Sequence, residues 1–349
     1  MFFYRLGSDA EFVFARISEF RPLLVNAQAV VGANKSLTLA SFIGTDGHAS
    51  TAELRPRPAH NVRMHMLDIA AGLLMTADVL KVKKNFQDVF LLARPIINDE
   101  TMAGHVHISF FTDEPSTKKA MECGFIYNGQ TERLESVNHN PGSPLPSLTS
   151  DDKHLAPILA DYAEKAYNGK LLTPHRVASR LAWFLHPLEL WLQPWHDRVA
   201  RNHSYGLGSD IVRWNSPTAQ RPVWDNMSHL AFIHYEYRTP STWLVHPALA
   251  YVYLALAKIT MTNWKLIDRL YTFSNEEKVL GIAFSKNPAN SAAGDVFFER
   301  LRKAEENGLR LSRDVEWLGK ALDICVAKRE EWFASPTARI DIEAWRELL

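Results

Sequence analysis

Four short segments of the chain place polar residues of catalytic type two positions apart. They are Asp9-Ala10-Glu11, Glu53-Leu54-Arg55, His105-Val106-His107 and Glu236-Tyr237-Arg238. In a β-strand, residues two apart point to the same face of the sheet, about 6–7 Å from each other. If the four segments are strands of one sheet, one face carries four carboxylates, two imidazoles and two guanidiniums.

This combination predicts divalent-metal chemistry. Desolvated carboxylates repel one another, and each buried charge costs several kcal/mol. The two arginines leave two of the four negative charges uncompensated, histidines aside. Hard carboxylate oxygens suit Mg²⁺ or Mn²⁺, which would remove that deficit. Carboxylates and imidazoles with arginine alongside are what a two-metal phosphoryl-transfer site requires.

Each pair also has an ordinary structural explanation when it is taken singly. An Asp-x-Glu pair commonly faces solvent, a His-x-His pair is often structural, and a Glu-x-Arg pair is commonly a salt bridge along a strand. These structural explanations are weaker for the four pairs together than for each pair singly, because all four segments are strand-like and have strongly apolar flanks. The metal–phosphate interpretation and the structural one both stay open on the residues alone.

Alternating apolar residues and turn signals predict the strands that would carry these pairs. The expected strands are 9–15, 36–43, 50–55, 89–92, 105–111 and 230–239. Helical spacing of apolar residues predicts helices over 60–82, 151–168 and 176–200, the last kinked or divided by Pro187 and Pro194. A further helix is expected from Pro240-Ser241 to Thr262, with Ser241 as its N-cap.

Composition shifts suggest how the chain is organised. We expect a catalytic domain over 1–274 and a helical C-terminal extension over 275–349. Within the domain, 112–150 is rich in Pro, Ser, Asn and Thr and lacks periodicity, so we predict a mobile flap.

Composition excludes several classes of protein. The 349 residues are 46% hydrophobic and 22% charged, which is typical of a soluble globular protein. Lys plus Arg and Asp plus Glu both number 39, so no broad nucleic-acid-binding surface is expected. The two cysteines form no CxxC pattern, and no apolar run approaches the roughly 20 residues that span a bilayer. We expect a cytoplasmic protein without a membrane partner.

Four longer motifs around these pairs resemble the phage-type carboxylate–amine ligases, which are amidoligases. The motifs are Gly7-Ser8-Asp9-Ala10-Glu11-Phe12, Gly44-Thr45-Asp46-Gly47 with Glu53-Leu54-Arg55-Pro56, Gly104-His105-Val106-His107-Ile108-Ser109, and Tyr235-Glu236-Tyr237-Arg238-Thr239-Pro240-Ser241. The resemblance spans roughly residues 4–260, and the segment 205–213 is also similar to the family. It implies an α+β fold with a glutamine-synthetase-like antiparallel sheet, one polar catalytic face and helices on the other face.

The resemblance also implies an activity and a set of residue roles. An ATP-dependent ligase of this kind converts a carboxylate to an acyl phosphate, which an amine then attacks to form an amide. Its expected cofactors are ATP and two Mg²⁺ or Mn²⁺ ions, and its substrates a small-molecule or peptide carboxylate and an amine acceptor. By motif, the expected metal ligands are Asp9, Glu11, Glu53, His105 and Glu236, the catalytic residues are Arg238, Arg55 and Glu236, and the nucleotide-binding residues are His107, Ser109 and Arg213.

The sequence departs from the family pattern in two places. Glutamine synthetases supply a further acidic ligand for which this chain offers only Asp46, a residue that also suits a turn. Asp9 stands where a longer Glu is common. A phage-encoded protein would act in the host cytoplasm.

Two other function classes stay open. A metal-dependent phosphoesterase or nuclease would use the same ligands with a water nucleophile. A catalytically inactive virion or scaffold relative is disfavoured, because such a protein has no reason to keep these carboxylates together.

Overall fold

The structure is a computed structural model that describes residues 3–18, 21–32, 43–45, 49–98, 100–112, 125–128, 133–136, 174–194, 212–213, 223–225, 230–238, 240–271, 290–334 and 337–349. The chain divides into two compact units. The larger comprises 6–106, 180–211 and 238–349, and the smaller comprises 1–5, 107–179 and 212–237. Strands β1 (Phe3–Ile17) and β8 (Gly104–Thr112) each contain residues of both units.

The sheet is built around β1 (Phe3–Ile17), which pairs antiparallel with β2 (Pro22–Val25), β4 (Thr51–Leu54) and β5 (Val89–Leu92). The hydrogen-bonded strand order is β11-β13-β8-β1-β4-β3. The other strands are β3 (Ile43–Thr45), β6 (Ile96–Ile97), β7 (Glu100–Thr101), β8 (Gly104–Thr112), β9 (Phe125–Asn128), β10 (Arg133–Ser136), β11 (Val212–Arg213), β12 (Val223–Asp225) and β13 (Leu230–Tyr237).

The two faces of β1 have different surroundings. On one face Phe12 is fully buried, and the Ser8 hydroxyl hydrogen-bonds Nε2 of His65 in helix α3 (Val62–Val82) at 2.9 Å. The other face carries Glu11 and then, two residues later, Val13, which enters an apolar cluster. That cluster contains Val13, Ala15, Leu92, Ile97 and Met102. The second face of β1 therefore changes from polar to apolar between Glu11 and Val13.

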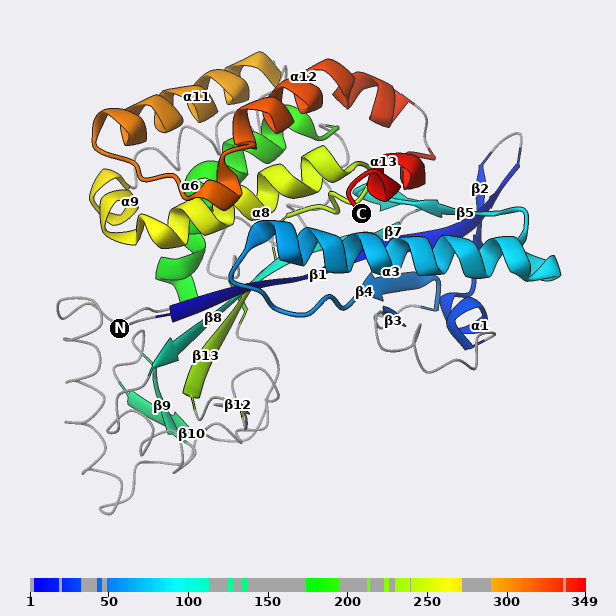
Figure 1. Ribbon diagram of the computed structural model, residues 1–349, viewed down its shortest axis with the longest axis horizontal. Coiled ribbons are helices and arrows are strands. Elements are labelled where there is room, and N and C mark those ends of the chain that lie inside the picture. The colour runs from blue at the N-terminus through cyan, green and yellow to red at the C-terminus, as the bar shows by residue number, and fades with distance from the viewer. Residues whose placement is uncertain are drawn as a thin grey trace. The chain divides into compact units, whose positions relative to one another are not determined.

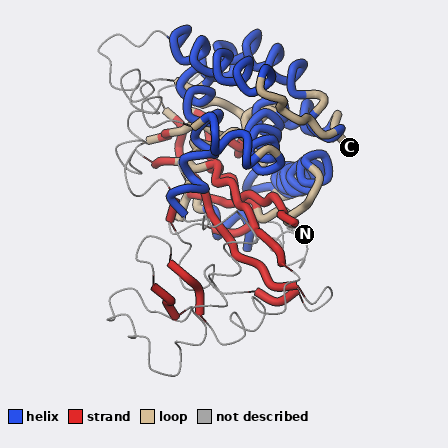
Figure 2. The backbone as a smooth tube through the Cα atoms, turned by 90° about the vertical axis from the view of Figure 1, so that its left-hand side faces the viewer, coloured by secondary structure: helices blue, strands red, loops and turns tan. Residues whose placement is uncertain are grey.

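Helices of the larger unit cover its strands, and α3 runs alongside β1 and β4 (Figure 1). Helix α3 begins at the N-cap Asn61, whose side chain accepts a hydrogen bond from the Met64 N–H at 3.2 Å. Figure 2 shows the helices of this unit packed together, and α12 contacts α8. The remaining helices are α1 (Ala27–Gly32), α6 (Pro174–Leu192), α8 (Pro247–Thr262), α9 (Trp264–Leu270), α11 (Asn290–Glu306), α12 (Leu318–Ala334) and α13 (Ile342–Arg346).

The end of the chain is built into the core of the larger unit. The Ile340 N–H donates to the Leu91 carbonyl at 2.9 Å, so residues after α12 extend the edge of β5. Trp345 in α13 is fully buried, and its Nε1 donates to the Leu244 carbonyl at 3.0 Å. The C-terminal helices thus stabilise the strand and loop against which they pack.

The structure confirms much of the predicted layout. It is an α+β fold with antiparallel strand pairing, and the strands expected at 9–15, 50–55, 89–92, 105–111 and 230–239 are present, as is the helix expected at 60–82. The described residues after 289 contain the three helices α11, α12 and α13. Most of the strand expected at 36–43 and the helix expected at 151–168 lie outside the described residues.

Other expectations were wrong in their detail. The helix expected to start at Ser241 starts at Pro247 with His246 as N-cap, because the Ser241 hydroxyl and N–H are both bonded to Glu189. Helix α6 ends at Leu192 rather than near 200, two residues before Pro194, and it continues through Pro187. Within 112–150 the chain forms the antiparallel pair β9–β10, although no periodicity indicated it. Mobility of this segment stays a prediction.

No helix in the part of the chain that the structure describes is both long enough and apolar enough to cross a membrane.

His246 makes the stability of the larger unit depend on pH. Its Nδ1 accepts a hydrogen bond from the Ala248 N–H at 3.1 Å, and its ring stacks on Trp332 at 4.6 Å between centroids. Burial lowers the pKa of His246 from 6.5 to about 4, against a weaker raising effect of Asp341. Between pH 6.5 and about 4, His246 is protonated in the unfolded chain but mostly neutral in the folded one. The free energy of unfolding therefore falls as the pH is lowered from about 6.5 to about 4.

We predict that His246→Asn removes this component of the pH dependence, because Asn keeps an N-cap acceptor and does not titrate. Between pH 7.5 and pH 5 the wild type should lose about 2 kcal/mol more free energy of unfolding than the variant. Urea denaturation of both proteins at the two pH values measures this difference. Equal losses in the two proteins would contradict the prediction.

Candidate metal centre

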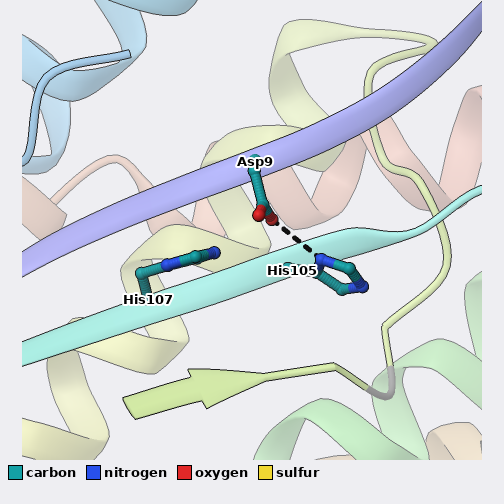
Figure 3. Close-up of side chains that lie close together, drawn as sticks. All are labelled: Asp9, His105 and His107. Carbon is teal, nitrogen blue, oxygen red and sulfur yellow. Dashed lines mark ion pairs between the residues drawn. The ribbon is translucent and has the colours of Figure 1, made fainter. Parts of the chain in front are cut away.

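Asp9 of β1 and His105 of β8 form an ion pair between adjacent strands. Oδ1 of Asp9 lies 2.9 Å from Nδ1 of His105, and the two side chains are 20% and 5% exposed. Asp9, His105 and His107 each offer one ligand atom, and these atoms lie within 4.8 Å of one another (Figure 3). Carboxylate and imidazole side chains at this spacing are those of a candidate metal centre.

A close backbone approach fixes the strand that carries His105. The Gly104 N–H donates to the Pro240 carbonyl at 2.9 Å, and Nε1 of Trp243 donates to the Gly104 carbonyl at 3.0 Å. A Cβ atom at position 104 would lie 2.4 Å from the Trp243 ring and 2.7 Å from the Ser241 carbonyl oxygen. Only glycine allows the segment 240–243 to lie this close to the start of β8.

Glu11 and Glu53 are directly opposite each other in the β1–β4 register, so both side chains start from the same face of the sheet. Glu11 is buried, with 5% exposure, and its Oε2 accepts the backbone N–H of Ala103 at 2.5 Å. A peptide N–H that donates to a buried carboxylate stabilises its charged form. Within the described residues, neither glutamate belongs to a group of three metal-ligating side chains.

Arg55 lies beside Glu53 and over Gly44. Its Nε donates to Oε1 of Glu53 at 2.9 Å, and its side chain is 53% exposed. A Cβ atom on Gly44 of β3 would lie 2.1 Å from the guanidinium carbon of Arg55. The absence of a side chain at position 44 is therefore what lets the guanidinium lie against β3.

Arg57, two residues further on, faces a different partner. Its guanidinium donates twice to Asp68 of α3, at 2.8 Å each. The hydrogen bonds from Arg57 lower the pKa of the Asp68 carboxyl, although burial acts in the opposite direction. The Arg-Pro-Arg sequence after β4 thus gives one cation to the sheet face and the other to the helix.

The other expected site residues occupy these positions. Arg213 and Glu236 are backbone partners in the β11–β13 pair, Arg238 directly follows β13, and Ser109 lies in β8. The side chains of Arg213, Glu236 and Ser109 lie outside the described residues, as does Asp46.

The structure also adds groups that the sequence reasoning missed. His107, expected at the nucleotide phosphates, lies in one cluster with Asp9 and His105. The sequence analysis did not predict that the Ala103 N–H donates to Glu11, because any residue can supply a backbone donor. It also did not predict the space above Gly44, because a missing side chain gives no catalytic motif. The glycines within the Gly-Thr-Asp-Gly and Gly-His-x-His motifs were the available signal.

The donor set fits a divalent cation. Asp9 supplies carboxylate oxygen, which Mg²⁺ and Mn²⁺ prefer, and the two histidines supply imidazole nitrogen, which Mg²⁺ rarely accepts. Mn²⁺ therefore suits this cluster better than Mg²⁺. A histidine ligand commonly has its other ring nitrogen beside a carboxylate, and Nδ1 of His105 lies 2.9 Å from Oδ1 of Asp9.

Comparisons with known proteins give the following picture. No family model matches the chain, and no curated protein matches it. Among solved structures, the chain is similar to the Pup ligase PafA in its complex with the prokaryotic ubiquitin-like protein Pup, with a TM-score of 0.46 and 10% identity over 98% of this chain and 66% of that one. The chain thus spans just under two thirds of the ligase.

Two further solved structures are similar to it. A glutamine synthase homologue has a TM-score of 0.40 and 12% identity over 100% of this chain and 71% of that one. A bifunctional glutathione synthetase from Pasteurella multocida has a TM-score of 0.43 and 11% identity over 99% and 49%. All three TM-scores are below 0.5, so neither the fold nor the function is inferred from them.

The two glycines beneath the site should respond differently to a methyl group. Gly104→Ala should lower the free energy of unfolding by about 1–3 kcal/mol, because the new Cβ meets a backbone carbonyl and a buried ring. Gly44→Ala should change it by no more than about 0.5 kcal/mol, because the half-exposed Arg55 side chain can swing away. Urea denaturation of both variants measures the contrast, and similar losses would show that one of the two close approaches is absent.

Removal of the Asp9 carboxylate should weaken metal binding. We predict that Asp9→Asn raises the dissociation constant for Mn²⁺ by about 10- to 100-fold, since a neutral amide oxygen is a weaker ligand for a divalent cation than a carboxylate and carries no charge beside His105. The electron paramagnetic resonance signal of free Mn²⁺ measures the constant. Asp88→Asn is the matched control, because Asp88 is 65% exposed and paired with Arg16. Equal Mn²⁺ affinity in wild type and Asp9→Asn would remove Asp9 from the site.

Proposed function

We propose that the protein is an ATP-dependent carboxylate–amine ligase that uses divalent metal ions at the candidate metal centre. The observation that carries the proposal is the group formed by Asp9, His105 and His107 beside the facing pair Glu11–Glu53. These residues belong to the motifs that resemble the phage-type amidoligases. The proposal includes the glutamine-synthetase-like form of the sheet.

The proposed reaction has two steps. An oxygen of the substrate carboxylate attacks the γ-phosphorus of ATP, the bond from that phosphorus to the β,γ-bridging oxygen breaks, and ADP leaves. The amine nitrogen then attacks the acyl carbon of the acyl phosphate, the carbon–oxygen bond breaks, phosphate leaves, and the nitrogen loses a proton. Asp9, His105 and the neighbouring carboxylates would hold divalent ions, whose positive charge would offset the negative charge of the phosphate groups.

The protein residues supply charge and orientation for these steps. Asp9, Glu11, Glu53, His105 and Glu236 are the proposed metal ligands. Arg55, whose half-exposed guanidinium lies next to Glu53, is proposed to bind a phosphate or the acid substrate. Arg238 would stabilise the phosphoryl group in transfer. Ser109 and Arg213 are proposed contacts to the nucleotide. His107 is also proposed to contact it, although its ring lies in the candidate ligand group with Asp9 and His105.

Substrate class follows from the same chemistry. The acid is a small-molecule or peptide carboxylate, and the acceptor is an amine. The segment 112–150 is proposed to cover the acyl phosphate, because water that reaches this intermediate hydrolyses it. A metal-dependent phosphoesterase would need no such cover and no ATP.

A hydroxylamine assay tests the proposal. With ATP, Mn²⁺, hydroxylamine and a panel of amino acids and small dicarboxylates, the protein should form a hydroxamate and ADP in equal amounts, because hydroxylamine replaces the amine. A carboxylate labelled with ¹⁸O should deliver one labelled oxygen to the released phosphate.

Variants tie this activity to the site. His105→Asn should lower turnover by at least about 100-fold, whereas His246→Asn, the same exchange outside the site, should keep wild-type turnover. Cleavage of bis(p-nitrophenyl) phosphate without ATP to p-nitrophenol and p-nitrophenyl phosphate, with the new oxygen of the monoester taken from water, would establish the phosphoesterase instead.

A further inference from the structure

Helix α6 carries a buried carboxylate that none of the four motifs contains. Glu189 is 4% exposed, and its Oε1 accepts two hydrogen bonds from Ser241, one from the backbone N–H at 2.9 Å and one from the hydroxyl at 2.6 Å. Ser241 is itself fully buried. Because hydrogen bonds to a carboxylate are stronger than neutral ones, this pair fixes both the backbone and the side chain of Ser241.

The segment held by Glu189 contacts the strand that carries His105. Ser241 forms a β-bridge with Ala103, and the Thr242 N–H donates to the Met102 carbonyl at 3.0 Å. The three residues 240–242 thus pair with the three residues 102–104 that lead into β8. The position of this segment determines where β8 begins.

The same segment also contacts the strand that carries Asp9 and Glu11. The Thr242 hydroxyl donates to the Glu11 carbonyl at 2.6 Å, and Nε2 of Gln193 donates to the Thr242 carbonyl at 3.2 Å. The Ala103 N–H, which reaches the Glu11 carboxylate, belongs to the residue bridged to Ser241. Glu189 of α6 and Gln193, the residue after this helix, therefore hold a segment that contacts both strands of the metal centre.

Packing alone does not explain why a carboxylate occupies position 189. From Leu181 to Leu192 the helix is otherwise filled almost entirely with buried apolar side chains. A carboxylate buried in such a helix is expensive, and an apolar residue of similar volume commonly gives equal or greater stability. The acceptor function of Glu189 toward Ser241 is the feature that an apolar residue would lack.

We propose that Glu189 is a positioning residue of the metal centre, acting through Ser241 on Ala103, Glu11 and His105. Without the carboxylate oxygen that accepts both hydrogen bonds from Ser241, the segment 240–242 is no longer held in place. The metal ligands on β1 and β8 are then less precisely positioned. The inference rests on the proposed function, because it requires that the centre binds metal.

Mn²⁺ affinity tests the inference directly. Glu189→Gln and Ser241→Ala should each raise the Mn²⁺ dissociation constant by about tenfold, as removal of a residue that orients a ligand does. The double variant should bind as the weaker single variant does, because both changes break one interaction. The same variants should lower kcat for ATP turnover more than they raise KM.

Thr260→Val is the control variant. It removes a buried hydroxyl whose hydrogen bond to the Leu256 carbonyl, at 2.8 Å, stays within α8. It should lower stability and leave Mn²⁺ affinity unchanged. If Glu189→Gln does not fold, Ser241→Ala, which keeps the backbone N–H donor, decides alone.

Three outcomes contradict different claims. Wild-type Mn²⁺ affinity and turnover in both single variants, with lower stability only, would overturn the positioning role and leave the proposed function intact. Additive losses in the double variant would show that Glu189 does not act through Ser241. A wild-type protein that neither binds Mn²⁺ nor turns over ATP would overturn the proposed function, and the inference with it.

Discussion

Carboxylates on one face of a sheet repel each other, and the residues around this face of β1 and β4 compensate for that repulsion. Asp9, Glu11 and Glu53 each have a different polar partner. Asp9 is paired with an imidazole at 2.9 Å, Glu11 accepts a peptide N–H at 2.5 Å, and Glu53 accepts from a guanidinium at 2.9 Å. A divalent cation at the proposed metal centre would compete with these partners for the carboxylate oxygens.

The backbone around the polar face is held in place by close packing. Val13 and Ala15 continue the face of β1 that carries Asp9 and Glu11, but they lie in an apolar cluster, so this face of β1 is packed at one end and polar at the other. The segment 240–243 packs against Gly104, where no side chain intervenes. Apolar packing of β1, β5 and the C-terminal residues thus supplies the stability that the charged residues do not.

The sequence predicted those parts of the fold that depend on local periodicity. The alternation of polar and apolar residues in 9–15 and 105–111 identified β1 and β8 and placed each polar pair on one face. The start of α8 was not predictable, because the partner that draws Ser241 away from a helix cap is Glu189, 52 residues earlier in the chain. The grouping of His107 with Asp9 likewise depends on the pairing of strands far apart in the sequence.

The central claim, that this face of the sheet is a divalent-metal site, is tested most directly by anomalous diffraction at the manganese edge from crystals grown with Mn²⁺. The account predicts a peak bonded to Asp9 and to a ring nitrogen of His105, at about 2.0–2.3 Å from each ligand atom. At saturating Mn²⁺, an anomalous map without a peak at this face, in which Asp9 and His105 still bond to each other, would contradict it.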